Sequence, residues 1–412
     1  MKAVVFTLGC KVNSCESSSL ISGLNSLGYE TSDQLGPADL YIINTCAVTA
    51  EAEKKSRQAI ARARKYNPDC KIIVTGCASE KSPRDFLEKQ NVTLVTGTKS
   101  KDKILSMLSE TGERLCEDDD YYEEYLPAVA SRDRAFVKVQ DGCDNFCSYC
   151  IIPYLRGRSR SRKKENVIKE IEYLSPAEAV ITGINLSAYD KKGGGLTSLI
   201  KELESVNCRV RLGSLEVNVI TDEFLAELKN LKDFAPHFHL SLQSGSDAVL
   251  KSMNRRYTRD EFYKKCKLIR EYFPDAAITT DIIVGYSTET EKDFEDSLDL
   301  AERVEFSDIH CFPYSRREGT VGAKLKELPP NVKQERTERM LALKNKLKNA
   351  FIERNIGVLA EFIPEDEEDG YTVGYTGNYI KCYIKGEVPR GKQTVRLTSR
   401  FSDGALAELV VR

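Results

Sequence analysis

Cys143-Asp-Asn-Phe-Cys-Ser-Tyr-Cys150 directly follows a strand-like run over residues 135–140. Three residues separate the first two cysteines and two separate the next pair. This spacing lets three thiolates bind three irons of a 4Fe–4S cluster and leaves the fourth iron open, which predicts an exchangeable external ligand. A zinc site is the alternative, but zinc cysteines usually come as two pairs with two-residue spacing, and the sequence has no second pair.

The triplet, with Tyr149 just before its last cysteine, resembles the radical S-adenosylmethionine (SAM) enzymes. That resemblance implies that the open iron binds the amino and carboxylate groups of SAM and that the cluster passes one electron to it. The sulfonium then breaks to a 5′-deoxyadenosyl radical. In such enzymes the cluster performs the electron transfer, and the protein positions the reactants and excludes water. Cys143, Cys147 and Cys150 are therefore the expected catalytic residues.

Composition limits what the rest of the 412-residue chain does. Its length gives room for two or three domains. The net charge of −2 removes any general attraction to nucleic acid, so RNA contacts must come from local patches. Without a secretory pattern or a membrane-spanning run, we expect a cytoplasmic protein that binds no membrane. Thirteen cysteines in such a protein indicate metal thiolates or buried thiols before disulfides.

Residues 1–115 predict an α/β domain with a doubly wound parallel sheet, because short apolar runs alternate with amphipathic stretches. The expected strands are 4–8, 40–44, 71–75 and 92–96. An acidic run over 117–124 lies in an expected linker over 116–132. Its simplest interpretation is a solvated connection, and an acidic binding element is the alternative.

Residues 133–347 predict a partial, open (β/α)6 barrel, because a strand–helix rhythm returns six times. The expected strands are 135–140, 178–184, 209–215, 237–242, 277–284 and 307–313. Parallel sheets bind ligands at the carboxyl ends of their strands. Polar residues gather at those ends, and the cysteine triplet ends the first strand of the same rim. After a charged helical stretch near 330–354, residues 348–412 predict a small antiparallel β-barrel.

Three further cysteines, Cys10, Cys46 and Cys77, each lie just beyond one of three successive expected strands in the first domain. In a doubly wound sheet those strand ends are neighbours, so the thiolates can converge on one object. Gly9 and Gly76 would let the backbone approach a bulky group closely. Three ordinary buried cysteines are the alternative. Their equivalent positions favour a second 4Fe–4S cluster.

Strings over essentially the whole chain resemble the methylthiotransferase family, and most closely its branch acting on N6-threonylcarbamoyladenosine in tRNA. They include Leu8-Gly-Cys-Lys-Val-Asn13 with Glu16, Asn44-Thr-Cys-Ala-Val-Thr49, Val74-Thr-Gly-Cys77, Ile181-Thr-Gly-Ile-Asn185 and Leu240-Ser-Leu-Gln-Ser-Gly-Ser-Asp247. Sister branches typically carry Gln-Met or Pro-Lys after the first cysteine, where this chain has Lys11-Val12. Segments 286–289 and 316–319 depart from the family pattern at the strand-end rim, which bears on the substrate more than on radical chemistry.

The resemblance implies a reaction in which one SAM supplies a methyl group and another the radical. A CH3–S unit then replaces hydrogen at adenine C2 of nucleotide 37, in the tRNA anticodon loop. The cluster at Cys10, Cys46 and Cys77 would carry the sulfur, and a low-potential electron donor and a sulfur source are implied partners. Thr182 and Gly183 would hold the SAM amino group, and Ser241 and Gln243 its ribose. The other expected cofactor-binding residues are Tyr149, Asn185, Ser214 and Glu216.

Two alternatives stay open. The same chemistry on isopentenyladenosine-37 of tRNA or on a ribosomal protein aspartate changes only the substrate. A non-catalytic iron–sulfur protein that binds RNA or transfers electrons belongs to another class.

RNA contacts are expected in two places. Alternating arginines just beyond the cysteine triplet suit a phosphate backbone held while one base is inserted, although a solvated, salt-bridged helix approach is the alternative. The terminal barrel resembles a TRAM domain, an RNA-binding module. The expected RNA-binding residues are Arg156, Arg158, Arg160, Arg162, Lys381, Lys385 and Lys392.

Overall fold

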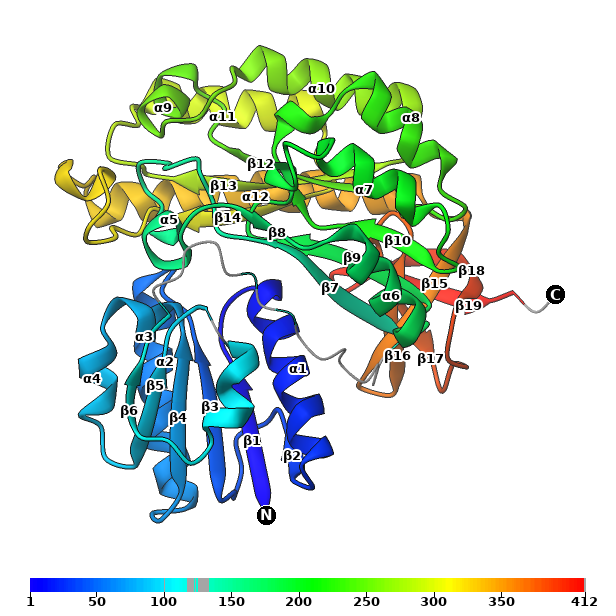
Figure 1. The fold of residues 1–412 in the computed structure, drawn as a ribbon. Helices are drawn as coiled ribbons and strands as arrows, with labels where there is room; N and C mark the ends of the chain where they lie inside the picture. Colours follow the sequence, from blue (N-terminus) through cyan, green and yellow to red (C-terminus); the bar gives the residue numbers. More distant parts are fainter. Residues whose placement is uncertain (100, 117–121, 123, 125–132, 411–412) are drawn as a thin grey trace.

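The structure is a computed structural model that describes residues 1–99, 101–116, 122, 124 and 133–410 (Figure 1). The acidic run expected over 117–124 therefore lies almost wholly outside the described residues. None of the helices in the described parts of the chain combines the length and apolar character that crossing a bilayer requires.

The N-terminal domain is a six-stranded sheet in the order β2-β1-β3-β4-β5-β6, and every strand pair is parallel. Its strands are β1 (Lys2–Thr7), β2 (Glu30–Ser32), β3 (Leu40–Thr45), β4 (Lys71–Gly76), β5 (Val92–Thr96) and β6 (Gly112–Arg114). Its helices are α1 (Lys11–Ser26), α2 (Ala50–Tyr66), α3 (Cys77–Lys81), α4 (Pro83–Leu87) and the 3₁₀ helix η1 (Lys101–Met107). The edge strands β2 and β6 were not predicted, because three residues are too few to show a periodic pattern.

Apolar side chains on both faces of this sheet explain its two helical layers. Successive residues of β3 point to opposite sides. Ile42 packs with α1 and η1, whereas Ile43 packs with α2 and α4. The predicted doubly wound sheet is thus confirmed. The carboxyl ends of its strands point toward the central domain (Figure 1).

The central domain is an open barrel built from two four-stranded sheets, β10-β9-β7-β8 and β11-β12-β13-β14. Its strands are β7 (Arg134–Asp141), β8 (Arg160–Ser161), β9 (Glu178–Gly183), β10 (Arg209–Leu212), β11 (Ser214–Leu215), β12 (His237–Gln243), β13 (Ala277–Val284) and β14 (Asp308–Pro313). The predicted strand over 209–215 is interrupted at Gly213, whose N–H donates to the Ile181 carbonyl at 2.8 Å. Apart from the two-residue antiparallel β8, the six predicted parallel strands are confirmed.

Helices cover the outer face of this barrel, and one core of buried side chains joins them to the strands. They are α6 (Lys164–Leu174), α7 (Gly195–Leu203), α8 (Asp222–Asn230), α9 (Asp247–Ser252), α10 (Arg259–Tyr272) and α11 (Glu291–Val304), with short 3₁₀ turns between them. The short helix α5 (Ile152–Arg156) instead packs against the N-terminal domain, where Leu155 joins the buried core. Thr258 and Glu261 cap α10 reciprocally, because each side chain accepts a hydrogen bond from the other's backbone N–H.

The long helix α12 (Pro330–Arg354) leads to a closed barrel in the order β15-β16-β17-β19-β18. Its strands are β15 (Leu359–Glu368), β16 (Tyr371–Thr376), β17 (Lys381–Lys385), β18 (Gln393–Phe401) and β19 (Gly404–Leu409). The predicted antiparallel barrel needs one correction, since β17 and β19 are parallel. The reason is that β18 crosses to pair with β15, so β19 returns beside β17 in the same direction.

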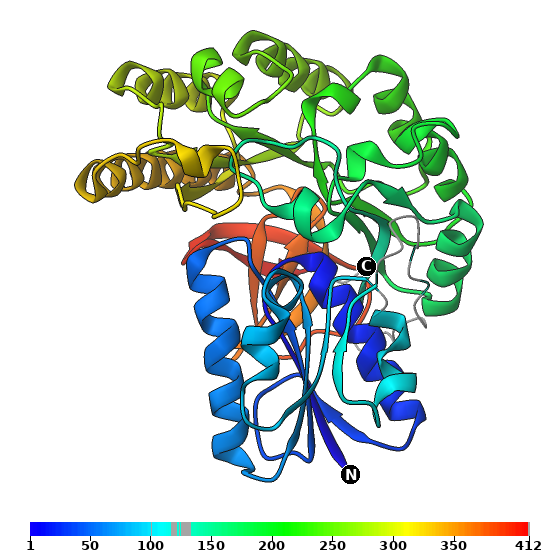
Figure 2. The ribbon, with the colours of Figure 1, turned by 60° about the vertical axis from the view of Figure 1, so that its left-hand side comes forward.

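The closed barrel lies beside the open one (Figure 2), and buried arginines of the open barrel contact it. Glu178 at the start of β9 pairs with Arg134, Arg209 and Arg211. Burial alone would raise the pKa of Glu178, but the three guanidinium groups outweigh it and lower the pKa to about 2. Arg211 also donates to the carbonyl of Thr376 in the closed barrel at 3.0 Å. Arginines of the central sheet therefore position the terminal barrel.

Candidate active site

Cys143, Cys147 and Cys150 lie in a tight loop that follows β7. The Cys143 N–H donates to the Gly157 carbonyl at 3.1 Å, and the Cys150 N–H donates to the Cys147 carbonyl at 2.9 Å. Phe146 adopts a left-handed backbone with φ of 47°. Burial raises the pKa of Cys150 to about 12, with Cys147 and Cys143 as neighbouring charges. The loop thus gathers the three thiols at the rim of the open barrel.

Two nitrogen donors reach the sulfurs of this first trio. Asn185 Nδ2 lies 3.7 Å from Cys143 Sγ, and Arg255 Nη1 lies 3.4 Å from Cys147 Sγ. Arg255 also pairs with Glu216 at 3.2 Å and donates to the Ser241 carbonyl at 2.9 Å. Two predicted cofactor-binding residues, Glu216 and Ser241, therefore meet around one arginine. Arg255, which lies in the loop after α9, was not predicted, because no local pattern marks it.

The other predicted cofactor-binding residues lie along the same rim. Thr182, Gly183 and Ser214 line a large cavity inside the open barrel. Gln243 is buried at the end of β12 with φ of 71°, a left-handed conformation that suits few side chains. Tyr149 is packed against the buried Tyr286 and its neighbours instead of lining that cavity.

Cys10, Cys46 and Cys77 follow β1, β3 and β4, which are adjacent strands of the N-terminal sheet. Gly9 has φ of 107°, and a Cβ there would lie 2.9 Å from Cys46 Sγ, so only glycine fits this close approach. Burial raises the pKa of Cys46 to about 11, with Cys77 and Cys10 as neighbouring charges. Gly76 instead allows close packing against the backbone of β3, because a Cβ there would lie 2.4 Å from the Thr45 carbonyl oxygen.

A fully buried set of charges lies between the two cysteine trios. Arg156 Nη1 lies 3.0 Å from Glu16 Oε1 and 3.0 Å from both carboxylate oxygens of Asp141. Lys138 Nζ lies 2.9 Å from Glu16 Oε1, and Lys101 pairs with the other Glu16 oxygen. These five residues form the interdomain ion cluster. It joins α1 and η1 of the N-terminal domain to β7 and α5 of the open barrel, so it fixes one trio relative to the other.

The large cavity, about 790 Å³, extends from the second trio into the open barrel. Cys10 and Lys11 line it from the N-terminal domain, and residues 375 and 378–381 line it from the closed barrel. All three histidines of the chain, His237, His239 and His310, line its wall. His237 and His239 are two residues apart on β12, so their side chains share one face of the strand. His310 lies on β14 and lines the same cavity. This histidine wall was not predicted, because alternation along a strand does not distinguish a cavity from a packed core.

Among the described residues, no group of three or more His, Cys, Asp or Glu side chains is arranged to bind a single metal ion. The trios therefore lack the tight spacing of a mononuclear zinc site. A cubane cluster instead takes each cysteine at a separate iron.

Comparison with known proteins agrees with this geometry. The radical SAM superfamily model matches residues 137–301, and the model of uncharacterized protein family UPF0004 matches residues 2–97. A threonylcarbamoyladenosine tRNA methylthiotransferase, MtaB, of Bacillus subtilis (strain 168) is 39% identical, over 94% of this chain and 91% of the relative. The chain belongs to the radical SAM tRNA methylthiotransferase family.

Another methylthiotransferase relative is similar at nearly the same level. The tRNA-2-methylthio-N(6)-dimethylallyladenosine synthase of Caldicellulosiruptor saccharolyticus is 35% identical, over 89% of this chain and 82% of the relative. Among solved structures, the radical SAM methyltransferase TsrM from Kitasatospora setae gives a TM-score of 0.57 at 12% identity. It covers 90% of this chain and 77% of that one, and shows the fold alone.

Membership of the methylthiotransferase family makes the protein an enzyme that uses SAM and a 4Fe–4S cluster. The donor set of the first trio suits such a cluster. Its three thiols stand at the barrel rim, and Asn185 and Arg255 donate toward two of the sulfurs. A tRNA substrate follows from the same membership.

Three of the four arginines predicted to bind RNA are corrected by the structure. Arg156 is completely buried in the interdomain ion cluster. Arg160 is buried and donates to the carbonyl of Arg156 at 2.8 Å, and Arg162 is buried and pairs with Glu170. Their acidic partners and burial leave them no access to a phosphate. Only Arg158 is exposed, with its guanidinium 4.8 Å from the centre of the Phe146 ring.

The predicted lysines of the closed barrel differ in their partners. Lys381 pairs with Glu368 at 3.1 Å, and Lys392 pairs with Asp233 at 2.6 Å. Lys385 is exposed and forms no ion pair with the described residues. Lys385 therefore keeps its charge open to RNA, whereas the exposed Arg158 lies 3.5 Å from the carboxylate of Asp144.

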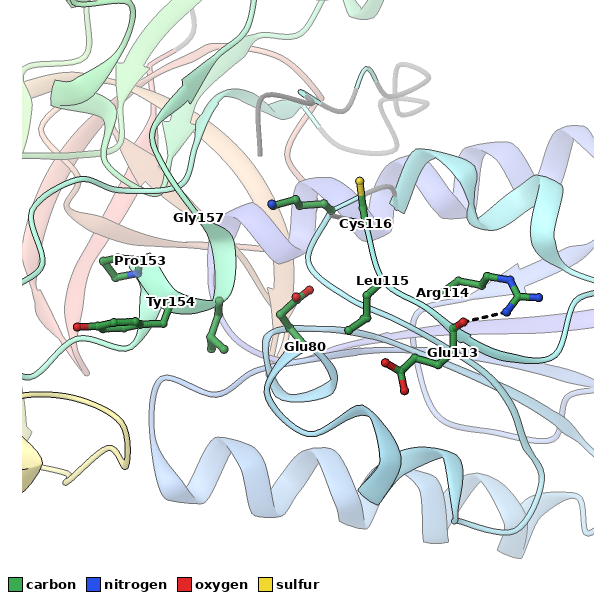
Figure 3. A pocket seen from close by; sticks show the side chains of 10 residues that line it. Glu80, Glu113, Arg114, Leu115, Cys116, Pro153, Tyr154 and Gly157 are labelled. Carbon is green, nitrogen blue, oxygen red and sulfur yellow. Dashed lines mark hydrogen bonds between the residues drawn. The ribbon is translucent and has the colours of Figure 1, made fainter. Parts of the chain in front are cut away.

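A second cavity, about 780 Å³, lies between β6 and α5 (Figure 3). Glu80, Glu113, Cys116 and Tyr154 are among its lining residues, and neither cysteine trio reaches it. It is separate from the chemistry described above.

Proposed function

We propose that the protein adds a methylthio group to C2 of N6-threonylcarbamoyladenosine at position 37 of tRNA. Two observations on the chain support the chemistry: two cysteine trios stand at one domain interface, and the interdomain ion cluster joins them. The names of the most similar relatives support the substrate.

The cysteine trios take separate roles in this proposal. Cys143, Cys147 and Cys150 hold the SAM-cleaving cluster, and Cys10, Cys46 and Cys77 hold a second 4Fe–4S cluster. When bound, the first cluster supplies the electron that cleaves SAM, and the second carries the sulfur to be delivered. A low-potential electron donor and a sulfur source are the partners that this chemistry requires.

The surrounding residues orient and shield the reactants. Arg255 holds Glu216 and the Ser241 carbonyl in place beside Cys147, so these groups are preorganised for the polar ends of SAM. The large cavity extends from Thr182, Gly183 and Ser214 to Cys10, and the closed barrel covers its far end. A base inserted there is removed from bulk water, which protects a radical from side reactions.

Nucleoside analysis of tRNA tests the substrate. Deleting the gene for this protein is expected to remove 2-methylthio-N6-threonylcarbamoyladenosine from total tRNA digests and to leave its unthiolated precursor. Liquid chromatography with mass spectrometry measures both nucleosides. Restoring the intact gene is the matched control.

Loss of methylthiolated dimethylallyladenosine instead would contradict the proposed substrate but keep the chemistry. An unchanged set of methylthiolated nucleosides, together with no SAM cleavage by the purified protein, would contradict the methylthiotransferase function itself.

A further inference from the structure

One lysine that lines the large cavity makes no ion pair with the described residues. Lys344 and Lys348 share Asp308, at 3.3 and 3.2 Å. Lys381 lies 3.5 Å from Asp403. Lys11, by contrast, lines the cavity from the first position of α1 and makes no ion pair within the described chain. A ligand with a negative group would provide Lys11 with an ion-pair partner.

A buried nitrogen without a partner lies in the same wall. His239 Nε2 is 3.2 Å from Asp281 Oδ2, and His239 Nδ1 is 2.9 Å from Thr279 Oγ1. Thr279 Oγ1 is in turn 2.9 Å from Nε2 of His237. Only 5% of His237 is exposed, and its Nδ1 is buried without a hydrogen-bond partner among the described residues. Buried polar atoms are almost always paired, so this nitrogen indicates a polar ligand.

One aromatic side chain in the cavity provides a free face for a base. Phe312 lines the cavity, and 46% of the residue is exposed. Tyr379 also lines the cavity, but it stacks between His237 and Tyr375 at centroid distances of 4.5 and 4.6 Å, so its ring faces are already covered. Exposed aromatic side chains commonly stack on unpaired RNA bases. The cavity therefore combines a stacking surface with a cation and a polar nitrogen.

Lys11 follows Cys10 directly in the sequence. Its ammonium group is therefore attached next to the trio that is proposed to deliver sulfur to adenine C2. On adenine, C2 and N6 lie on the same edge of the ring. If sulfur is delivered to C2 from the Cys10 trio, the group attached to N6 comes within reach of the side chain next to Cys10. A threonylcarbamoyl group carries a carboxylate and a hydroxyl, whereas a dimethylallyl group carries neither.

We propose that Lys11 binds the carboxylate of the N6 substituent and thereby selects an acidic adenosine over an apolar one. This inference rests on the proposed function. His237 supplies a second polar contact to the same substituent. A dimethylallyl group would leave Lys11 and the His237 nitrogen covered and unpaired, which costs affinity without any clash.

Binding of anticodon stem-loop RNAs tests the inference. Three RNAs differ only at position 37, which carries threonylcarbamoyladenosine, its neutral methyl ester or dimethylallyladenosine. Fluorescence anisotropy measures their dissociation constants on the cluster-loaded protein with SAM and no reductant. A charge-assisted hydrogen bond contributes about tenfold or more to a binding constant. The wild type is therefore expected to bind the acid about tenfold more tightly than the ester.

Lys11→Gln is expected to lose this preference by weakening the acid alone, and Lys11→Arg is expected to retain it. Lys65→Gln is the matched control, since it removes an exposed charge from the last turn of α2. Iron content verifies that each variant carries its clusters.

Two results would overturn the inference: a wild type that binds acid and ester equally, or a Lys11→Gln variant that weakens all three RNAs alike. Equal weakening would identify Lys11 as a phosphate contact. Failure of the proposed function looks different, because the wild type would then thiolate none of the threonylcarbamoyladenosine RNA under reducing conditions, whatever its binding preference.

Discussion

Cys147→Ala is expected to abolish the reductive cleavage of SAM. Cys147 is one of three thiols at the barrel rim, and Arg255 lies 3.4 Å from its sulfur. A cluster with two protein ligands is not held in place for one-electron transfer to SAM. Release of 5′-deoxyadenosine from reconstituted protein with dithionite, measured by liquid chromatography, is expected to fall to the level without protein.

Cys46→Ala provides the contrasting variant for this experiment. It removes a ligand of the second trio, so SAM cleavage is expected to persist while methylthiolation of tRNA stops. Cys208→Ala is the control, because Cys208 is partly buried and belongs to neither trio. Equal loss of both activities in Cys46→Ala would contradict separate roles for the two trios.

Arg156→Met is expected to destabilise the contact between the N-terminal domain and the open barrel by about 3–5 kcal/mol, the typical cost of removing one partner from a buried ion pair. The substitution keeps most of the side-chain volume but removes the guanidinium that bridges Glu16 and Asp141 in a buried interface. It also removes the 2.7 Å hydrogen bond from Arg156 Nη2 to Asn13. Urea unfolding followed by circular dichroism measures the change.

Arg158→Met is the matched control for this prediction. It lies two residues away with its side chain 65% exposed, so its cost is expected to stay within about 0.5 kcal/mol. Adding Glu16→Gln to Arg156→Met is expected to cost further stability, since Lys101 and Lys138 would keep their buried charges and lose that carboxylate. An Arg156→Met protein as stable as Arg158→Met would show that the interdomain ion cluster does not hold the domains together.

Several features were predictable because local patterns and chain topology determine them. Strand–helix alternation predicted the parallel sheets, and the ends of parallel strands share one edge. That rule alone placed Cys10, Cys46 and Cys77 together, although about thirty residues separate each from the next. The helix over 330–354 and the cap at Thr258 were likewise predictable from local signals.

Other features depend on partners that the linear sequence does not indicate. The run from Arg156 to Arg162 looks like an RNA-binding patch, but its carboxylates come from Glu16, Asp141 and Glu170. Arg255 approaches Cys147 across 108 residues of chain. By itself the sequence determined the strands, the helices and the two cysteine trios, because periodicity and spacing are local. Only the tertiary structure decided which charges are buried and which face the cavity, because burial depends on elements that meet in space.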